Sequence, residues 1–352
     1  MIVHLHSDSF FINPFIGFIT DNYGTEDHRI VVYRKGDFKR EEADSSIVYY
    51  YKGKKDIGTL YKMLKKADKI VIHSLGIEME MLLLLYMHKK LCRKTVWIIW
   101  GSDLYWKRDR SRDMMSNIIE HMREKIISLF PYIGCLVTGD YELAVKWYRT
   151  DAAMYRVNYP DKDERKIVDA LAPYDKGNDG AVNIVIGNSG TPSNGHKEVC
   201  EQLKKWKDEN IKIYLPLSYG VPEYIEEVKT LYKDEFGDKA VIVDKLMPLE
   251  EYLKFLSTMD IGIFNNNRQQ ALGNIFALMY MGKRVYLKEG TSMWNELVGI
   301  QGSILTSCDE ITGDNFLTGQ LDESGKKINK DVAVKLHYSE EYLKNEWDKV
   351  FA

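Results

Sequence analysis

The sequence has few of the features that direct a protein out of the cytoplasm or into a membrane. Its first ten residues contain no basic stretch followed by an apolar one, so they do not have the form of a signal peptide. The longest fully apolar run, Met81 to Met87, is far shorter than the roughly 18 residues that a spanning helix needs. We therefore expect a cytoplasmic protein without a membrane-spanning helix.

Cysteine and metal-binding motifs are also scarce. The four cysteines, Cys92, Cys135, Cys200 and Cys308, lie too far apart for a C-x-x-C motif and are too few for a disulfide-stabilised scaffold. The run Asp161-Lys162-Asp163 has the form of a metal-binding D-x-D motif, but it lies in a polar stretch, which favours a solvated charge run. Because no other group of residues has the spacing of metal ligands, we expect chemistry without a metal ion or other cofactor.

Strong charge of one sign is missing as well. A net charge of −3 over 352 residues gives no reason to expect a nucleic-acid-binding protein. The charge is unevenly divided, because residues 1–155 hold 24 basic and 20 acidic side chains (net +4) and the remainder 25 and 32 (net −7). Aromatic residues are abundant, with 23 tyrosines and 7 tryptophans, and the 45% of hydrophobic residues is enough for a large core.

Short apolar runs alternate with amphipathic stretches from about residue 69 onward, which is typical of βαβ units around parallel sheets. In the first half we predict helices at 77–91 and from 103 to about 129, with strands at 69–73, 95–100 and 133–137. In the second half we predict strands at 182–187, 211–215, 241–243, 261–264, 284–287 and 303–305. The predicted fold class is α/β with doubly wound sheets.

A polar stretch separates the two halves. Residues 161–180 gather turn formers between Pro173 and Gly180, which predicts a linker. We therefore expect a first domain over residues 1–160, a second over 181–335, and a C-terminal helix over 336–352 that docks near the first domain. In such domains, ligands bind beyond the carboxyl ends of the strands, so the loops after strands hold the candidate functional residues.

Two loops of the predicted second domain are suited to a phosphate. The run Gly187 to His196 lies between a strand and a helix, and its small residues let a phosphate approach backbone N–H groups. The loop fits neither a Walker A loop nor G-x-G-x-x-G. An ordinary Gly/Ser turn explains it equally well, because such turns are common in connections from a strand to a helix. The run Asn265 to Asn274 contains three successive asparagines, Arg268 and two glutamines, which favours binding of a diphosphate or sugar hydroxyls over a solvated turn.

Two residues of the first domain are candidate general bases. Asp103 follows the predicted strand 95–100, where a partly buried carboxylate can accept a proton from a hydroxyl. Helix capping by Ser102 or Asp103 is the alternative. His73 closes the neighbouring strand and is the second candidate, with a purely structural hydrogen bond as its alternative.

Four ordered runs carry a resemblance to a known family. They are I-W-G-S-D-L-Y from Ile99, G-N-S-G-x-x-S-N-x-H from Gly187, Y-I-E-E-V from Tyr224 and R-Q-Q-x-x-G from Arg268. In this order and spacing they resemble the bacterial transferases of glycosyltransferase family 56, which add 4-acetamido-4,6-dideoxy-D-galactose (acetamidofucose) from a TDP donor to lipid II in enterobacterial common antigen synthesis. The resemblance covers about residues 70–300, and His73 falls where the family has a strand-end histidine.

The resemblance implies a GT-B architecture of two Rossmann-like doubly wound domains facing across a cleft, with no obligatory metal. The second domain would hold the nucleotide sugar and the first the acceptor. Catalytic roles are predicted for Asp103, His73 and Arg268. Around the donor we expect Gly187, Asn188, Ser189, Ser193, Asn194, His196, Tyr219, Lys245, Gln269, Gln270, Gly273 and Asn274.

We therefore expect a metal-independent glycosyltransferase that moves a deoxy-amino sugar from a dTDP-sugar co-substrate to an undecaprenyl-diphosphate-linked saccharide. It would act in surface polysaccharide synthesis, peripherally at the inner face of the bacterial cytoplasmic membrane. Alternatives are a UDP- or GDP-sugar transferase with another acceptor, and a non-catalytic sugar-nucleotide-binding partner of polysaccharide assembly. Aromatic and basic side chains together suit an anionic membrane surface. We therefore predict a patch for membrane and acceptor at Trp106, Lys107, Arg108, Arg110 and Arg112.

Overall fold

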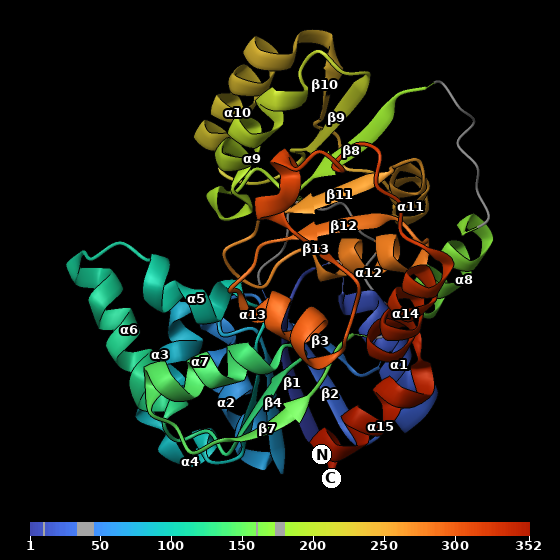
Figure 1. Cartoon of the computed structure of the whole chain (residues 1–352). Helices are drawn as coiled ribbons and strands as arrows, with labels where there is room; N and C mark the ends of the chain where they lie inside the picture. The colour runs from blue at the N-terminus through green and yellow to red at the C-terminus, as the bar shows by residue number, and fades with distance from the viewer. Residues whose placement is uncertain (10, 34–45, 160, 173–179) are drawn as a thin grey trace. The chain divides into compact units, whose positions relative to one another are not determined.

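The computed structural model describes residues 1–9, 11–33, 46–159, 161–172 and 180–352, and the chain folds into two compact units (Figure 1). The first unit comprises residues 1–161 and 339–352, and the second comprises residues 162–338. The second unit is thus continuous in sequence, whereas the end of the chain completes the first.

The first unit is built on a parallel sheet whose described strands lie in the order β3-β2-β1-β4-β5-β6-β7. The chain runs from β1 outward to β3 and then returns to the other side of β1, so the topological switch point lies between the carboxyl ends of β1 and β4. The strands are β1 (Ile2–Ser7), β2 (His28–Tyr33), β3 (Val48–Tyr50), β4 (Lys69–His73), β5 (Thr95–Ile98), β6 (Tyr132–Cys135) and β7 (Ala153–Arg156).

Helices cover both faces of this sheet. Alternation along β4 shows the division, because Ile70 and Ile72 pack with α2, α3 and α6, whereas Val71 packs with α1 and α15. The helices are α1 (Ile12–Tyr23), α2 (Ile57–Lys66), α3 (Met79–Met87), α4 (Lys89–Cys92), α5 (Ser102–Asp109), α6 (Met114–Ile127), α7 (Thr138–Tyr148) and α15 (Glu340–Phe351). Both faces of the central strands are therefore buried, as the apolar runs of the sequence require.

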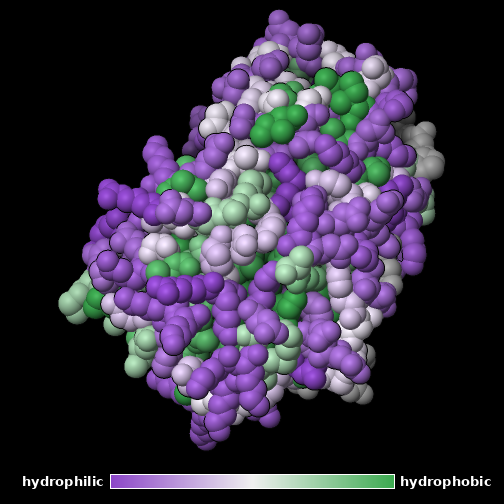
Figure 2. Space-filling model, turned by 90° about the horizontal axis from the view of Figure 1, so that it is seen from below, coloured by the Kyte–Doolittle hydropathy of each residue, from purple (hydrophilic) through white to green (hydrophobic). Residues whose placement is uncertain are grey.

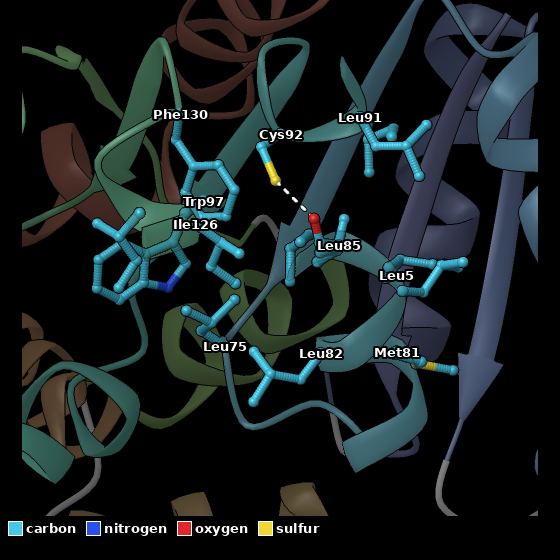
Figure 3. Packing of buried hydrophobic residues seen from close by; sticks show 14 of the residues in the cluster. Leu5, Leu75, Met81, Leu82, Leu85, Leu91, Cys92, Trp97, Ile126 and Phe130 are labelled. Atoms are coloured by element: carbon cyan, nitrogen blue, oxygen red, sulfur yellow. Dashed lines mark hydrogen bonds between the residues drawn. The ribbon is translucent and has the colours of Figure 1, made fainter. Parts of the chain in front are cut away.

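The larger core of the first unit lies on the side of α2, α3 and α6. In Figure 3, Leu82 and Leu85 from α3, Trp97 from β5 and Ile126 from α6 point into one cluster. Burying each side chain of this size stabilises the fold by about 1.5–3 kcal/mol. The Cys92 thiol lies in the same cluster and donates a hydrogen bond to the Leu85 carbonyl oxygen at 3.3 Å.

The second unit is built on a parallel sheet whose described strands lie in the order β10-β9-β8-β11-β12-β13. Its switch point lies between the carboxyl ends of β8 and β11. The strands are β8 (Val182–Ile186), β9 (Ile211–Pro216), β10 (Ala240–Val243), β11 (Ile261–Phe264), β12 (Arg284–Leu287) and β13 (Thr306–Ser307). The helices are α8 (Lys162–Leu171), α9 (His196–Leu203), α10 (Pro222–Phe236), α11 (Leu249–Ser257), α12 (Leu272–Tyr280), α13 (Ser292–Trp294) and α14 (Glu323–Ala333).

The predicted α/β class with doubly wound sheets is confirmed, but several element predictions are wrong, among them the helix expected at 77–91, which is divided into α3 and α4. The helix expected from 103 to 129 is broken into α5 and α6, because Asp113 caps a new helix by accepting a hydrogen bond from the Ser116 N–H at 2.9 Å. The strand expected at 303–305 lies at 306–307 as β13. Of the expected linker 161–180, residues 162–171 form α8, which belongs to the second unit and holds Glu164 within 3.0 Å of the Tyr338 hydroxyl, whereas residues 173–179 lie outside the described residues.

The face seen in Figure 2 is mostly hydrophilic, and hydrophobic side chains reach the surface there in small separate patches. Scattered exposed apolar side chains of this kind are ordinary for a folded domain. Within the described ranges, no helix has the length and apolar character to cross a membrane.

Candidate active site

The loop after β8 is folded back on itself by one buried asparagine. Asn194 Nδ2 donates hydrogen bonds to the Ser189 carbonyl oxygen and to Thr191 Oγ1, both at 2.8 Å. Its Oδ1 accepts from the Asn188 N–H at 3.3 Å. The turn begins at Gly187, with φ of 64°, where a Cβ would lie 2.6 Å from Asn194 Oδ1. Glycine is therefore required where the chain leaves the strand.

Gln270 ties the loop after β11 to the loop after β8. Its Nε2 donates to Asn188 Oδ1 at 2.9 Å and to Ser189 Oγ at 3.0 Å, while its Oε1 accepts from Ser193 Oγ at 2.7 Å. The Asn267 N–H also donates to the Ser193 carbonyl oxygen at 3.0 Å. The two loops that flank the switch point are therefore held as one structure.

A third loop, after β9, joins the same edge of the sheet through backbone contact. The Gly190 N–H donates to the Tyr219 carbonyl oxygen, and the Val221 N–H donates to the Gly190 carbonyl oxygen, both at 2.8 Å. A Cβ at Gly220 would lie 2.2 Å from that same Gly190 oxygen. The Tyr219 hydroxyl accepts a hydrogen bond from Asn188 Nδ2 at 2.9 Å, so side chains reinforce the junction.

The start of α12 is the open part of this edge. Gly273 is exposed, and beyond its chain neighbours and its own helix backbone nothing lies within 4 Å of where its Cβ would be. The first N–H groups of a helix have no partner within the helix. Arg268 and Gln269 precede it, and Arg268 Nη1 donates to the Gln269 carbonyl oxygen at 3.1 Å. Desolvation raises the pKa of the Tyr219 hydroxyl, and the nearby Arg268 guanidinium opposes this rise. A guanidinium beside a helix N-terminus is an arrangement that binds an anion such as a diphosphate.

At the carboxyl edge of the first sheet, Asp103 holds three segments together. Its Oδ2 accepts from the Leu75 N–H and from Trp97 Nε1, each at 2.7 Å, and its Oδ1 accepts from the Trp100 N–H at 3.0 Å. The residue is 4% exposed. Arg123 closes this structure from α6, donating to the carbonyl oxygens of Asp103 at 2.6 Å and Leu75 at 2.9 Å.

His73 is one member of a buried histidine chain. Its Nε2 lies 3.1 Å from His4 Nδ1, and His4 Nε2 lies 3.0 Å from His28 Nδ1. On the other side, His73 Nδ1 lies 2.5 Å from the Tyr159 hydroxyl. Desolvation, reinforced by the neighbouring histidines, holds the pKa of His4 and of His73 well below its usual value. Burial lowers the pKa of His28 to about 4, although the charge of Asp27 opposes this.

The sequence model of a glycosyltransferase family described as 4-alpha-L-fucosyltransferase, glycosyl transferase group 56, matches residues 9–352. The chain belongs to this family. Structural likeness extends to the (UDP-forming) alpha,alpha-trehalose-phosphate synthase of Burkholderia vietnamiensis, with 8% identity, a TM-score of 0.66, and 99% of this chain and 98% of that chain covered. It extends also to Anabaena Alr3699/HepE in complex with UDP and glucose, with 12% identity, a TM-score of 0.67, and coverage of 99% and 98%. At these identities the likeness shows the fold, which is of the GT-B type.

In this group 56 glycosyltransferase, the predicted donor residues divide by exposure. Ser189, Asn194 and His196 are fully buried, so they frame the loops and are closed to a ligand in this conformation. Burial lowers the pKa of the His196 imidazole to about 4, which keeps it neutral. The residues that remain accessible at the switch point are Asn188, Ser193, Tyr219, Arg268, Gln269, Gln270, Gly273 and Asn274. Asn274 Nδ2 is engaged, since it donates to the Tyr252 hydroxyl at 2.7 Å.

Lys245 lies apart from these interlocked loops in the order of the strands. It follows β10, and β9 lies between β10 and β8 in the sheet. Its backbone therefore leaves the sheet two strands from the loop after β8, about 10 Å away. Its side chain is exposed. Lys245 was predicted to bind the donor because it follows a strand in the sequence.

The structure also alters the interpretation of Asp103. A general base needs an oxygen that can receive the substrate's proton, but three N–H groups already occupy both Asp103 oxygens. The geometry favours a role in positioning Trp100 and Leu75. The expected alternative, helix capping, is not observed either, because no side chain caps α5.

The basic patch predicted on α5 is largely engaged in contacts within the first unit. Lys107 bonds to Glu120 at 3.3 Å and to Glu124, and its ammonium lies 4.8 Å from the centre of the Tyr148 ring. Arg108 bonds to Asp109, and Arg110 donates to the Lys107 carbonyl oxygen. Trp106 is half-buried, and Arg112 is exposed. The patch therefore does not present five available side chains.

Sequence reasoning missed the residues that surround the switch point of the first sheet. Asp8 and Ser9 directly follow β1, Ser74 follows β4 with φ of 71°, and Phe11 precedes α1. Tyr159, beyond β7, joins them through its bond to His73. The sequence signal for Asp8 and Ser9 is weak, because the strand before them interrupts its apolar residues with His4, His6 and Ser7.

Proposed function

We propose that this glycosyltransferase moves a deoxy-amino sugar from a dTDP donor to a saccharide carried on undecaprenyl diphosphate, at the inner face of the bacterial cytoplasmic membrane. The observation that carries the donor half is the open start of α12 beside Arg268 and Gln269. Two structures of similar fold are described as complexes with UDP, one of them an alpha-glucosyltransferase (13% identity, TM-score 0.60, both chains covered to 100%). This supports a nucleoside diphosphate at the second unit.

In the proposed reaction, an acceptor hydroxyl oxygen bonds to the anomeric carbon while the bond from that carbon to the diphosphate oxygen breaks. The nucleoside diphosphate leaves with the electron pair, and the hydroxyl proton passes to a base. Arg268 and the first N–H groups of α12 would stabilise the charge that develops on the leaving diphosphate. Because these groups are fixed by the interlocked loops, little reorganisation is needed during the reaction.

Asp8 is the carboxylate that we propose as the base in place of Asp103. It follows β1 at the switch point of the first sheet, where ligands of doubly wound units bind. Asp8→Asn should lower kcat by about 10²–10⁴-fold and leave dTDP affinity unchanged, as the loss of a general base does. An unchanged kcat in this variant would show that Asp8 is not the general base.

The lipid-linked acceptor is supported by an apolar surface formed by α3 and α6. Met87 is 72% exposed and Met114 is 77% exposed, with Leu83, Tyr86, Met115 and Ile118 also at the surface. An open depression of about 680 Å³ lies there, lined by Tyr86, Met114, Asn117, Ile118, His121 and Met122. Exposed Lys89, Lys90 and Arg112 adjoin this surface in sequence. Apolar side chains bordered by cations suit a membrane with anionic lipids.

Transfer is tested with purified protein, a dTDP-linked deoxy-amino sugar and an undecaprenyl-diphosphate-linked saccharide, followed by mass spectrometry of the lipid product. Thermal shifts with dTDP, UDP and GDP identify the nucleotide, because a ligand that binds only the folded state raises the melting temperature. A shift with UDP or GDP alone would contradict the dTDP assignment. Nucleotide binding without transfer to any acceptor would contradict the enzymatic proposal.

The donor site is tested by Arg268→Ala, which should weaken nucleotide binding and abolish transfer. Lys245→Ala is the matched control, since it removes another cation from the same unit away from the switch point. Equal losses in the two variants would show that nonspecific charge, and not the site at α12, holds the diphosphate.

Membrane contact is tested by sedimentation with vesicles of phosphatidylglycerol and phosphatidylethanolamine. Met87→Gln combined with Met114→Gln should reduce vesicle binding and leave dTDP affinity unchanged. Ile300→Gln serves as the control, because Ile300 is 50% exposed in the second unit. Binding that both sets of changes reduce equally would argue against a specific surface on α3 and α6.

A further inference from the structure

Three aromatic rings of the first unit meet beyond the carboxyl ends of its strands. The Phe11 ring lies 5.6 Å from the rings of both Trp100 and Tyr159, and the latter two lie 5.7 Å apart. Phe11 is 49% exposed, whereas Trp100 and Tyr159 are half-buried. The three rings together form one contiguous aromatic surface, and a contiguous apolar surface marks a binding site more often than a single exposed side chain does.

The polar atoms of these rings are satisfied inside the protein. Trp100 Nε1 donates to the Tyr159 hydroxyl at 2.8 Å. Since an indole N–H can only donate, the Tyr159 proton is left to bond with His73 Nδ1, 2.5 Å away. The neutral His73 then carries its proton on Nε2 and donates to His4 Nδ1, and His4 donates to His28 in the same sense. Trp100 and Tyr159 therefore contribute apolar ring surface and no unpaired polar group to this aromatic cluster.

The cluster is also rigid, because buried groups hold it from below. The His6 ring lies 5.3 Å from that of Trp100, and the Phe15 ring lies 5.7 Å from that of Tyr159. Asp103 fixes the Trp100 backbone through the 3.0 Å bond to its N–H. A surface held in this way loses little conformational freedom when it binds a ligand.

We propose that Phe11, Trp100 and Tyr159 form a stacking site for one pyranose ring of the acceptor saccharide. A pyranose has an apolar face of C–H groups, which suits flat rings without free polar atoms, and hydroxyls around its rim. A polar side chain for those hydroxyls lies at the same edge of the sheet on Asp8, which directly follows β1. This inference rests on the proposed function, since it names the part of that acceptor which the first unit recognises.

The position favours a sugar over an isoprenoid chain or a protein partner. The rings lie at the switch point of the first sheet, where ligands of doubly wound units bind, whereas the broad apolar surface of this unit lies on α3 and α6. An isoprenoid chain would find a larger apolar area at that second surface. His73 acts here as a positioning residue, because it orients Tyr159 and does not itself reach the ligand.

The test is saturation-transfer NMR on the whole protein without a donor, using methyl glycosides of N-acetylglucosamine and glucose, and geranyl phosphate as the isoprenoid probe. We expect saturation transfer to the sugar ring protons. Phe11→Ala should weaken sugar affinity by about three- to tenfold, the usual worth of one aromatic contact. Tyr61→Ala, which removes a half-buried aromatic side chain of α2 in the same unit, is the control and should leave it unchanged.

A second pair of variants separates the ring from its hydroxyl. Tyr159→Phe keeps the ring and should retain sugar affinity within about twofold, whereas Tyr159→Leu should lose it as Phe11→Ala does. The proposal would be overturned if neither sugar showed saturation transfer, or if Phe11→Ala left the saturation transfer unchanged. Binding of geranyl phosphate alone at this site would also overturn it. Because dTDP binding is measured separately by thermal shift, a failure of the donor assignment does not imitate any of these results.

Discussion

Stability of the first unit should fall steeply between pH 7.5 and pH 5.5, because its histidine chain is held neutral. His4, His28 and His73 are at most 3% exposed, and burial depresses the pKa of each. In the unfolded chain, a histidine titrates near pH 6.5. Lowering the pH through that value therefore protonates the unfolded state and not the folded one, which favours unfolding.

The magnitude follows from the same linkage. Between pH 7.5 and pH 5.5, each histidine that stays neutral in the folded state costs about 1.3 kcal/mol of unfolding free energy. The three members of the chain together cost about 4 kcal/mol, a large part of the roughly 5–15 kcal/mol by which a domain is stable. The second unit contains His196, whose pKa is lowered to about 4, and should lose about 1.3 kcal/mol through it over the same range.

The assay is urea unfolding followed by tryptophan fluorescence in a Trp206→Phe, Trp294→Phe background, so that the remaining tryptophans all report on the first unit. The pH range stays above the ordinary carboxylate pKa values, which limits other contributions. His28→Gln should reduce the loss between the two pH values by about one third. A midpoint that is constant, or that rises toward pH 5.5, would refute the neutral chain.

Three further predictions concern single sites. Asp103→Asn should destabilise the first unit by about 1–3 kcal/mol in the same assay, because an amide nitrogen would face N–H groups that now donate hydrogen bonds to the carboxylate. Equal stability of the variant would refute the positioning role. Gly195→Ala should lower the urea midpoint of the second unit by an equivalent of about 1–3 kcal/mol, since φ is 65° and the Cβ would lie 2.8 Å from the Asn265 carbonyl oxygen; Gly273→Ala, in open space, is the control. All four cysteines are buried, and burial raises the pKa of Cys92, Cys200 and Cys308 to about 12, so iodoacetamide at pH 8 should label none by mass spectrometry until urea is added.

The sequence predicted most of the strands from residue 69 onward, because buried parallel strands are continuous apolar runs between turn formers. The strands at 261–264 and 284–287 agree with β11 and β12 to the residue. Helix boundaries were harder, since the apolar spacing continues across the break between α5 and α6. The local cap at Asp113 decides that boundary, and its Ser116 partner three residues later was a readable signal.

The candidate site was predicted by segment, but not by the role of each residue. Gly187 and Arg268, which were chosen because they follow predicted strands, both lie at the switch point of the second sheet. Which side chains stay accessible depends on contacts between distant segments, such as Gln270 reaching Asn188. A single sequence does not show which distant side chains contact each other. For the same reason, His4, His28 and His73 could not be recognised as one chain before the order β2-β1-β4 was known.

The two units also differ in how far apart in the sequence their contacting residues lie. The second unit is continuous over residues 162–338, so its contacts close short loops. The first unit is complete only when α15 packs against it. Trp347 Nε1 donates to the Asn158 carbonyl oxygen at 2.8 Å, and the Trp347 ring lies 5.9 Å from that of His73. Phe351 lies 4.9 Å from His28. Since these contacts span the whole second unit, they close the longest loops and carry the larger entropic cost. The histidine chain and the aromatic cluster therefore depend on contacts from the last residues of the chain, whereas the second unit is completed without them.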